Sequence, residues 1–110
     1  MNYSEKLENN ILKIFVSGDL DLENYGNLRD QVSAALQKNM VVALDMCEVS
    51  YVDSSGVAAL IESKQKAEKA GKEFKIQKPS EAVTSVLNLA KLDTFLSSKI
   101  KLIFNEIFGT

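Results

Sequence analysis

The sequence VVALDMCEVSYVDSSGVAAL, residues 41–60, joins an apolar run to a short polar segment and then to a second apolar run. The first run starts at Met40, is apolar almost throughout and includes the β-branched pair Val41-Val42. A run without alternation is typical of a strand that is buried on both faces, with helices on both sides of a sheet. From about Ser55 the apolar residues recur at helical spacing. The segment YVDSSG, residues 51–56, is therefore predicted to be the turn from this strand into a helix.

The residues that follow predict two helices with a strand between them. The first helix is expected to stop at Gly71 and to bury one face, which carries Val57, Leu60, Ile61 and Ala67. The short segment EFKIQ, residues 73–77, is predicted to be a strand. Pro79 and Ser80 open the second helix, whose apolar face carries Val83, Val86, Leu87 and Ala90. Beyond it we expect an extended piece at 95–97 and an amphipathic helix at 100–108, where KIKLIF also permits a strand.

The residues that precede the first run predict a hairpin and one helix. YSEKLE at 3–8 leads through Asn9-Asn10 into ILKIFVSG at 11–18, and asparagine tolerates the positive φ of a tight hairpin turn. In the second of these strands one face is fully apolar, with Leu12, Ile14 and Val16. A helix then runs to about Lys38, because apolar residues recur at helical spacing at Leu28, Val32, Ala35 and Leu36.

The order strand, helix, strand, helix, strand, helix builds a parallel sheet with right-handed crossovers. The initial hairpin adds an antiparallel strand at one edge. We therefore predict a single α/β domain over residues 1–110, with a small, mixed but mostly parallel sheet and flanking helices.

Composition excludes several classes of function. The chain has 110 residues, a net charge of −2 and no histidine, so it lacks Ser-His-Asp and Cys-His arrangements and the commonest transition-metal ligand. The charge gives no reason to expect binding to nucleic acid or to an anionic membrane. No secretory signal pattern or membrane-length apolar stretch is present, which favours the cytoplasm. We expect no metal and no cofactor, and Cys47 is expected to be a small apolar filler beside the buried strand.

The polar segment between strand and helix admits two interpretations. Asp53, Ser54 and Ser55 are all good helix caps, because their oxygens accept the unpaired N–H groups of a first turn. A serine nucleophile would need a base, and the elbow motif would need a glycine two residues before it. A phosphate-binding loop would need more glycines and a following lysine. Catalysis by this segment is therefore not expected.

The segment also resembles the signature of STAS domains, and specifically that of bacterial anti-sigma factor antagonists: an apolar strand, an Asp-Ser-Ser-Gly motif and an apolar helix. The resemblance extends upstream to VSGDLD at 16–21 and downstream to GKEFKIQKPSEAVTSVLNLAKLDTFL at 71–96. It covers roughly residues 10–97. Asn24-Tyr25-Gly26 departs from the small residues and threonine that the family often has there.

The resemblance implies a phosphorylation switch. In antagonists of this type an anti-sigma factor serine kinase phosphorylates the second serine of the motif, which Ser55 matches, and a metal-dependent serine phosphatase resets it. The unmodified form binds the kinase and frees the sigma factor. The residues implied in partner contact are Asp21, Asp53, Ser54, Ser55, Gly56 and Val57. The domain itself would then be no enzyme, and phosphate would add about −1.5 to −2 charge at a helix start without unfolding it.

Two other functions remain open at this point. The first is that of a STAS module that scaffolds a transporter or signalling complex without phosphorylation. The second is that of a small nucleotide-binding α/β enzyme. Asp19 and Asp21 point to the same side if the strand pattern persists through both, and diverge if the chain is already turning, so a carboxylate pair and a turn or cap role both remain open. The lysine-rich run from Lys64 to Lys78 is interleaved with glutamates and is interpreted as a solvated face.

Overall fold

The structure is a computed structural model, and it describes residues 1–90. Four strands form one sheet in the order β1-β2-β3-β4. The strands are β1 (Asn2–Glu8), β2 (Ile11–Leu20), β3 (Val41–Val52) and β4 (Glu73–Gln77), and the helices are α1 (Tyr25–Lys38), α2 (Ser54–Lys69) and α3 (Glu81–Ala90). The elements expected at 95–97 and 100–108 lie outside the described residues, so the prediction of one domain over residues 1–110 stays a prediction.

The predicted hairpin is present at one edge of the sheet. β1 pairs antiparallel with β2, and Glu8 lies opposite Ile11. The two residues between them, Asn9 and Asn10, have φ values of 53° and 64°. Positive φ at both positions matches the right-handed twist of the strands, which explains the two asparagines. The other pairs, β2 with β3 and β3 with β4, are parallel, so the sheet is mixed and mostly parallel as expected.

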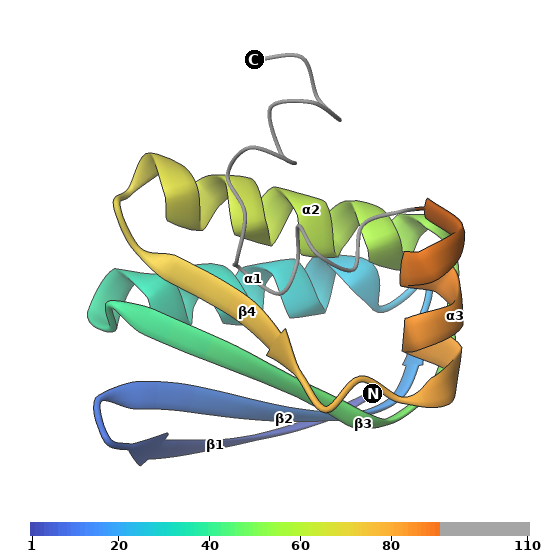
Figure 1. The fold of residues 1–110 in the computed structure, drawn as a ribbon, viewed down its shortest axis with the longest axis horizontal. Coiled ribbons are helices and arrows are strands. Elements are labelled where there is room, and N and C mark those ends of the chain that lie inside the picture. Colours follow the sequence, from blue (N-terminus) through green and yellow to red (C-terminus); the bar gives the residue numbers. More distant parts are fainter. Residues whose placement is uncertain (91–110) are drawn as a thin grey trace.

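The expectation of helices on both sides of the sheet is wrong for the two long helices. Figure 1 shows α1 and α2 side by side on the same face, with α3 beyond the end at which β3 runs into α2. The strand order explains this, because β2, β3 and β4 are added in one direction. Two right-handed crossovers that advance in one direction place both of their helices on the same face.

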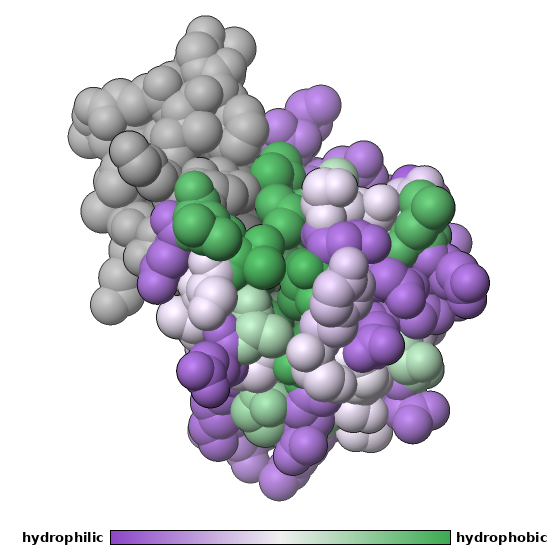
Figure 2. All heavy atoms as spheres, turned by 90° about the vertical axis from the view of Figure 1, so that its right-hand side faces the viewer, coloured by the Kyte–Doolittle hydropathy of each residue, from purple (hydrophilic) through white to green (hydrophobic). Residues whose placement is uncertain are grey.

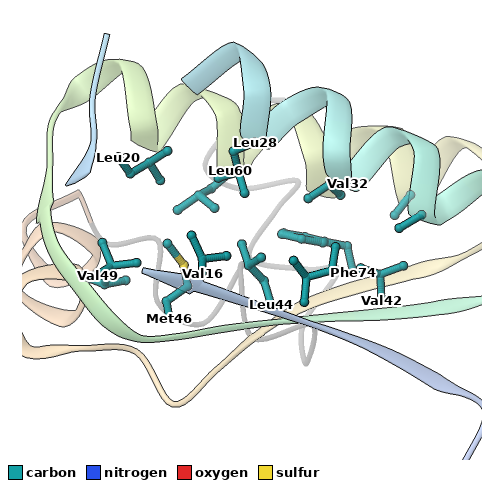
Figure 3. Close-up of a cluster of buried hydrophobic side chains, with 14 of the residues drawn as sticks. Val16, Leu20, Leu28, Val32, Val42, Leu44, Met46, Val49, Leu60 and Phe74 are labelled. Atoms are coloured by element: carbon teal, nitrogen blue, oxygen red, sulfur yellow. The ribbon is translucent and has the colours of Figure 1, made fainter. Parts of the chain in front are cut away.

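The core lies between the sheet and the helices α1 and α2. The four residues of α1 that the sequence predicts to face the core are all buried: Leu28, Val32, Ala35 and Leu36. Figure 3 shows Val42, Leu44 and Met46 of β3 near Leu60 of α2 and Phe74 of β4. These side chains hold the sheet and both helices together, so the end at which β3 meets α2 rests on a packed core.

β3 is longer than predicted and extends to Val52. Its pairing with β2 continues through Leu20 opposite Val52, with register shifts between Phe15 and Ser17 and between Gly18 and Asp19. The burial of five consecutive residues ends at Met46, and Cys47 is exposed. The prediction that Cys47 fills the core is therefore wrong, because the irregular pairing turns the strand after Met46.

One lysine of the lysine-rich run is buried, contrary to the interpretation of the run as a solvated face. Lys64 of α2 is buried, and its Nζ donates a hydrogen bond of 3.2 Å to the carbonyl oxygen of Phe74. The same Nζ lies 3.4 Å from a carboxylate oxygen of Glu68, one turn further along the helix. Lys64 therefore ties α2 to β4, which the sequence pattern did not indicate.

Candidate functional site

Asp53 connects β3 to α2 and caps the helix. Its Oδ1 accepts hydrogen bonds from the backbone N–H groups of Ser55 at 2.9 Å and of Gly56 at 3.1 Å. Its own N–H donates to the carbonyl oxygen of Leu20 at 3.2 Å, which fixes the start of the helix to the end of β2. Of the three candidate caps in the sequence, the structure therefore selects Asp53, and both serines belong to the first turn of the helix.

Gly56 is the residue that permits α2 to start so close to β2. A Cβ atom at this position would lie 2.6 Å from the carbonyl oxygen of Leu20 and 2.7 Å from its Cγ. It would also lie 3.0 Å from Cγ1 of Val52. A contact of 2.6 Å to a backbone oxygen is too short for any side chain. The glycine of the motif is thus required by packing, and it sets the position of the serines before it.

The two serines differ in surroundings. Ser54 is exposed and Ser55 is half-buried. Successive helix residues are rotated by about 100°, so the two side chains leave α2 in different directions. Ser55 precedes Glu62 by about two helical turns and so belongs to the side of α2 on which Glu62 pairs with Arg29 of α1 at 3.6 Å. Within the described residues, neither serine hydroxyl is engaged in a hydrogen bond, so both are available to a partner.

Asp21 lies in the loop between β2 and α1 and organises that loop. Its Oδ1 accepts the backbone N–H groups of Glu23 and Asn24, each at 3.1 Å. The carbonyl oxygen of Asp19 accepts a hydrogen bond of 2.9 Å from the Asn24 side chain. Asp21 therefore has the turn role, and its loop lies beside the start of α2 because Leu20 contacts Asp53.

A shallow groove lies between the start of α2 and α3. It has a volume of about 420 Å³ and is lined by Val52, Asp53, Ser54, Val57, Val86 and Leu89. We call it the α2–α3 groove. Figure 2 views this end of the molecule and shows apolar side chains gathered in the middle of the face. Leu89 is 86% exposed, although it belongs to an apolar helix.

Sequence reasoning found Asp53, Ser54 and Val57 of this groove but missed the contribution of α3. Val86 was expected only as a core residue, and Leu89 was not singled out. A signal was present, because Leu89 lies off the helix face formed by Val83 and Leu87. An apolar residue on the solvent side of an amphipathic helix indicates a contact surface when a second apolar patch adjoins it.

Two chain segments at this end of the sheet are acidic. Residues 17–27 and 47–57 contain five carboxylates and no lysine or arginine: Asp19, Asp21, Glu23, Glu48 and Asp53. Within residues 1–90, these carboxylates do not form a group of three or more that could hold a metal ion. The five charges are therefore spread along two segments at this end of the sheet, which Arg29 borders by lying over the Tyr25 ring at 5.6 Å.

Cys47 lies near this surface but is a poor nucleophile. The neighbouring Asp45 carboxylate raises the pKa of its thiol, because it accepts a hydrogen bond from the protonated form and repels the thiolate. The same carboxylate accepts the backbone N–H of Cys47 at 3.1 Å.

Among residues 1–90, no helix is long and apolar enough to span a bilayer.

Comparisons with known proteins found a matching family model, a relative and several solved structures. A family model described as "Mlab, STAS domain" matches residues 4–102. Sulfate transporter 2.1 of Arabidopsis thaliana is 38% identical over 74 residues, an alignment that covers 67% of this chain and 11% of the transporter. The chain therefore spans only about a ninth of the length of this relative.

Several solved structures have the same fold. An anti-sigma factor antagonist from Mycobacterium paratuberculosis is similar with a TM-score of 0.78 and 17% identity, over 98% of this chain and 91% of that one. The anti-sigma factor antagonist SpoIIAA in its unphosphorylated form has a TM-score of 0.71 and 18% identity, over 99% and 98% of the two chains. The phosphorylated form of Bacillus SpoIIAA has a TM-score of 0.67 and 17% identity, over 96% and 97%. At such identities these similarities establish the fold alone.

Proposed function

The chain belongs to the STAS domain family, and from this premise we propose that it is an anti-sigma factor antagonist switched by phosphorylation of Ser55. The unphosphorylated domain binds an anti-sigma factor serine kinase in the cytoplasm and thereby frees the sigma factor. Phosphorylation ends this binding, and a metal-dependent serine phosphatase restores it by hydrolysis. The domain is the substrate of both enzymes and is not itself an enzyme.

One observation carries the proposal: two hydroxyls without a hydrogen-bond partner among the described residues stand in the first turn of α2, on a rim held rigidly by Asp53 and Gly56. In the transfer step the Ser55 Oγ attacks the γ-phosphorus of ATP and loses its proton, while ADP leaves. The kinase supplies the base and the metal-bound nucleotide. The chain supplies a hydroxyl in a fixed position, which is what in-line transfer requires of an acceptor.

The same geometry supports release without unfolding. A phosphate on Ser55 gains roughly 0.3–1 kcal/mol from the helix start, while the nearby Asp53 carboxylate offsets part of this gain. In a protein interface, by contrast, the dianion must be paired or remain hydrated. A loss of about 3 kcal/mol there is a drop of about 10²-fold in affinity. The switch therefore acts on the contact surface and leaves the fold intact.

Phosphorylation in vitro tests this function. The purified domain is incubated with ATP, Mg²⁺ and each serine anti-sigma factor kinase encoded in the same genome, and the modified peptide is sequenced by mass spectrometry. We expect one phosphate, located on Ser55. Ser54→Ala should still accept phosphate, whereas Ser55→Ala should not. Modification of Ser54 in place of Ser55, or no modification by any of these kinases, would contradict the proposal.

A second function is favoured by one comparison, the 38% identity to a stretch of a sulfate transporter. In that case the domain is a STAS module that regulates or scaffolds a larger assembly, and Ser55 stays unmodified. The experiment above separates the two functions, because a scaffold module would bind its partner equally well before and after incubation with kinase and ATP.

A further inference from the structure

The α2–α3 groove adjoins the proposed phosphorylation site and has the character of a protein-docking surface. Four of its six lining residues are apolar, and two others, Asp53 and Ser54, come from the motif itself. Val57 and Val86 already pack against the core, so they form a fixed floor. Leu89 projects from α3 with 86% of its surface exposed. A fixed apolar floor beside an exposed leucine is typical of a pocket that receives one side chain of a partner.

The charges around the groove indicate the chemistry of that partner. Asp53 lies on the groove rim, and the two acidic segments at the same end of the sheet, residues 17–27 and 47–57, contain no lysine or arginine. Acidic segments beside an apolar groove match lysine or arginine beside an apolar anchor, because complementary charges steer and orient the encounter of two proteins.

We infer that the α2–α3 groove receives one apolar side chain of the anti-sigma factor kinase, and that this anchor is flanked by basic residues which face the two acidic segments. The inference rests on the proposed function, which supplies the kinase as the partner. It adds a contact on α3, which the serine motif does not contain.

The two serines then have separate roles. Ser54 lines the groove and belongs to the docking contact, whereas Ser55 is not among the residues that line it. A phosphate on Ser55 would stand next to Ser54 in the first turn of α2 and would hold water beside the groove. An apolar anchor needs a dry contact, so the phosphate weakens docking through hydration as well as through charge. Loss of binding by Ser55→Glu should therefore persist at 0.5 M salt, which screens exposed charges.

Substitutions of Leu89 test the groove directly, because this exposed side chain can be changed without disturbing the core. The full chain and its variants are titrated by calorimetry with the purified kinase and ADP. Leu89→Ser should lose about tenfold in affinity, as expected for an anchor contact. Leu89→Lys should lose more than Leu89→Glu, because a lysine repels the basic flank. The matched control is Leu7→Ser on β1, since Leu7 is also a leucine and is 64% exposed at the opposite end of the sheet.

Other results of these titrations would each contradict a specific part of the proposal. If no serine anti-sigma factor kinase binds the unsubstituted chain, the proposed function and the groove both fail. If the kinase binds and Leu89→Ser binds as tightly, only the groove inference fails. A lower thermal midpoint of Leu89→Ser with unchanged affinity would assign the groove to residues 91–110 of the same chain. A change from dimer to monomer in Leu89→Ser, measured by light scattering, would assign it to a second copy.

Discussion

The two ends of α2 each depend on a glycine, but for opposite reasons. Gly56, in the first turn, has no room for a side chain, because a Cβ atom would lie 2.6 Å from the carbonyl oxygen of Leu20. Gly71, just after the helix, has a φ of +68°, and a Cβ atom there would meet nothing within 4 Å. The start of the helix is therefore fixed by packing against β2, whereas its end needs only a left-handed backbone.

The two ends of α2 therefore have different roles. The start of the helix carries the proposed recognition site, whereas its end only connects α2 to β4. At the start of α2 the cap, the glycine and the end of β2 hold the two serines in one position relative to the core. At the far end, Lys72 closes the connection by donating to the carbonyl oxygen of Leu36, and it is not among the residues that line the α2–α3 groove. Substitutions at the two ends should therefore differ in how much they change the free energy of unfolding and in whether they alter kinase binding.

The largest effect is expected for Gly56→Ala. The added methyl group must displace the backbone of Leu20 or tilt α2, and overpacking of this kind costs roughly 1–3 kcal/mol. The matched control is Gly26→Ala in the first turn of α1, where a Cβ atom would only touch the Arg29 guanidinium at 3.8 Å. That variant should gain up to about 1 kcal/mol from helix propensity. Urea unfolding measures both, and a Gly56→Ala domain as stable as the control would contradict the packing account.

The second largest loss of stability is expected for substitution of Asp53, the N-cap of α2. Asp53→Ala removes the acceptor of two backbone N–H groups and should lower the free energy of unfolding by about 1 kcal/mol. Asp53→Asn keeps a side-chain oxygen at the same place and should lose much less. Both are compared by their urea midpoints at pH 7. Equal losses in the two variants would mean that the negative charge, and not the hydrogen bonds, stabilises the start of α2.

The smallest effect of the three is expected at Gly71. Alanine in the left-handed region costs about 1–2 kcal/mol, but the stiffer unfolded chain returns about 0.4–1 kcal/mol. Gly71→Ala should therefore lose about 1 kcal/mol or less, and Gly71→Asn should lose still less because asparagine tolerates this conformation. Neither variant should alter kinase binding. A loss of binding by Gly71→Asn would show that the two ends of α2 are not independent.

Much of the architecture followed from the sequence because it rests on local patterns. The alternation in β2, the helical spacing of Leu28, Val32 and Leu36, and the tandem asparagines each depend on residues that are close in the chain. The placement of α1 and α2 on one face did not follow, because it depends on the order in which strands join the sheet. The exposure of Cys47 was missed for a similar reason, since it follows from irregular pairing between β2 and β3.

The candidate site was predictable only in part. The motif residues 53–57 could be named in advance, but three candidate caps competed on local chemistry alone. The choice of Asp53 and the need for Gly56 both depend on Leu20, which is more than thirty residues away in the sequence. The same distance hides the α2–α3 groove, because its walls come from β3, α2 and α3 and meet only in the folded chain.

The central claim is that the hydroxyl of Ser55 stands on a rigid contact surface, where negative charge ends binding without unfolding the domain. Paired measurements on Ser55→Asp and Ser55→Ala, of affinity for the kinase and of thermal midpoint, test it most directly. We expect Ser55→Ala to bind like the unsubstituted chain and Ser55→Asp to bind much more weakly, with nearly equal midpoints. Equal affinity of the two variants, or weak binding that merely accompanies a collapsed midpoint of Ser55→Asp, would contradict the claim.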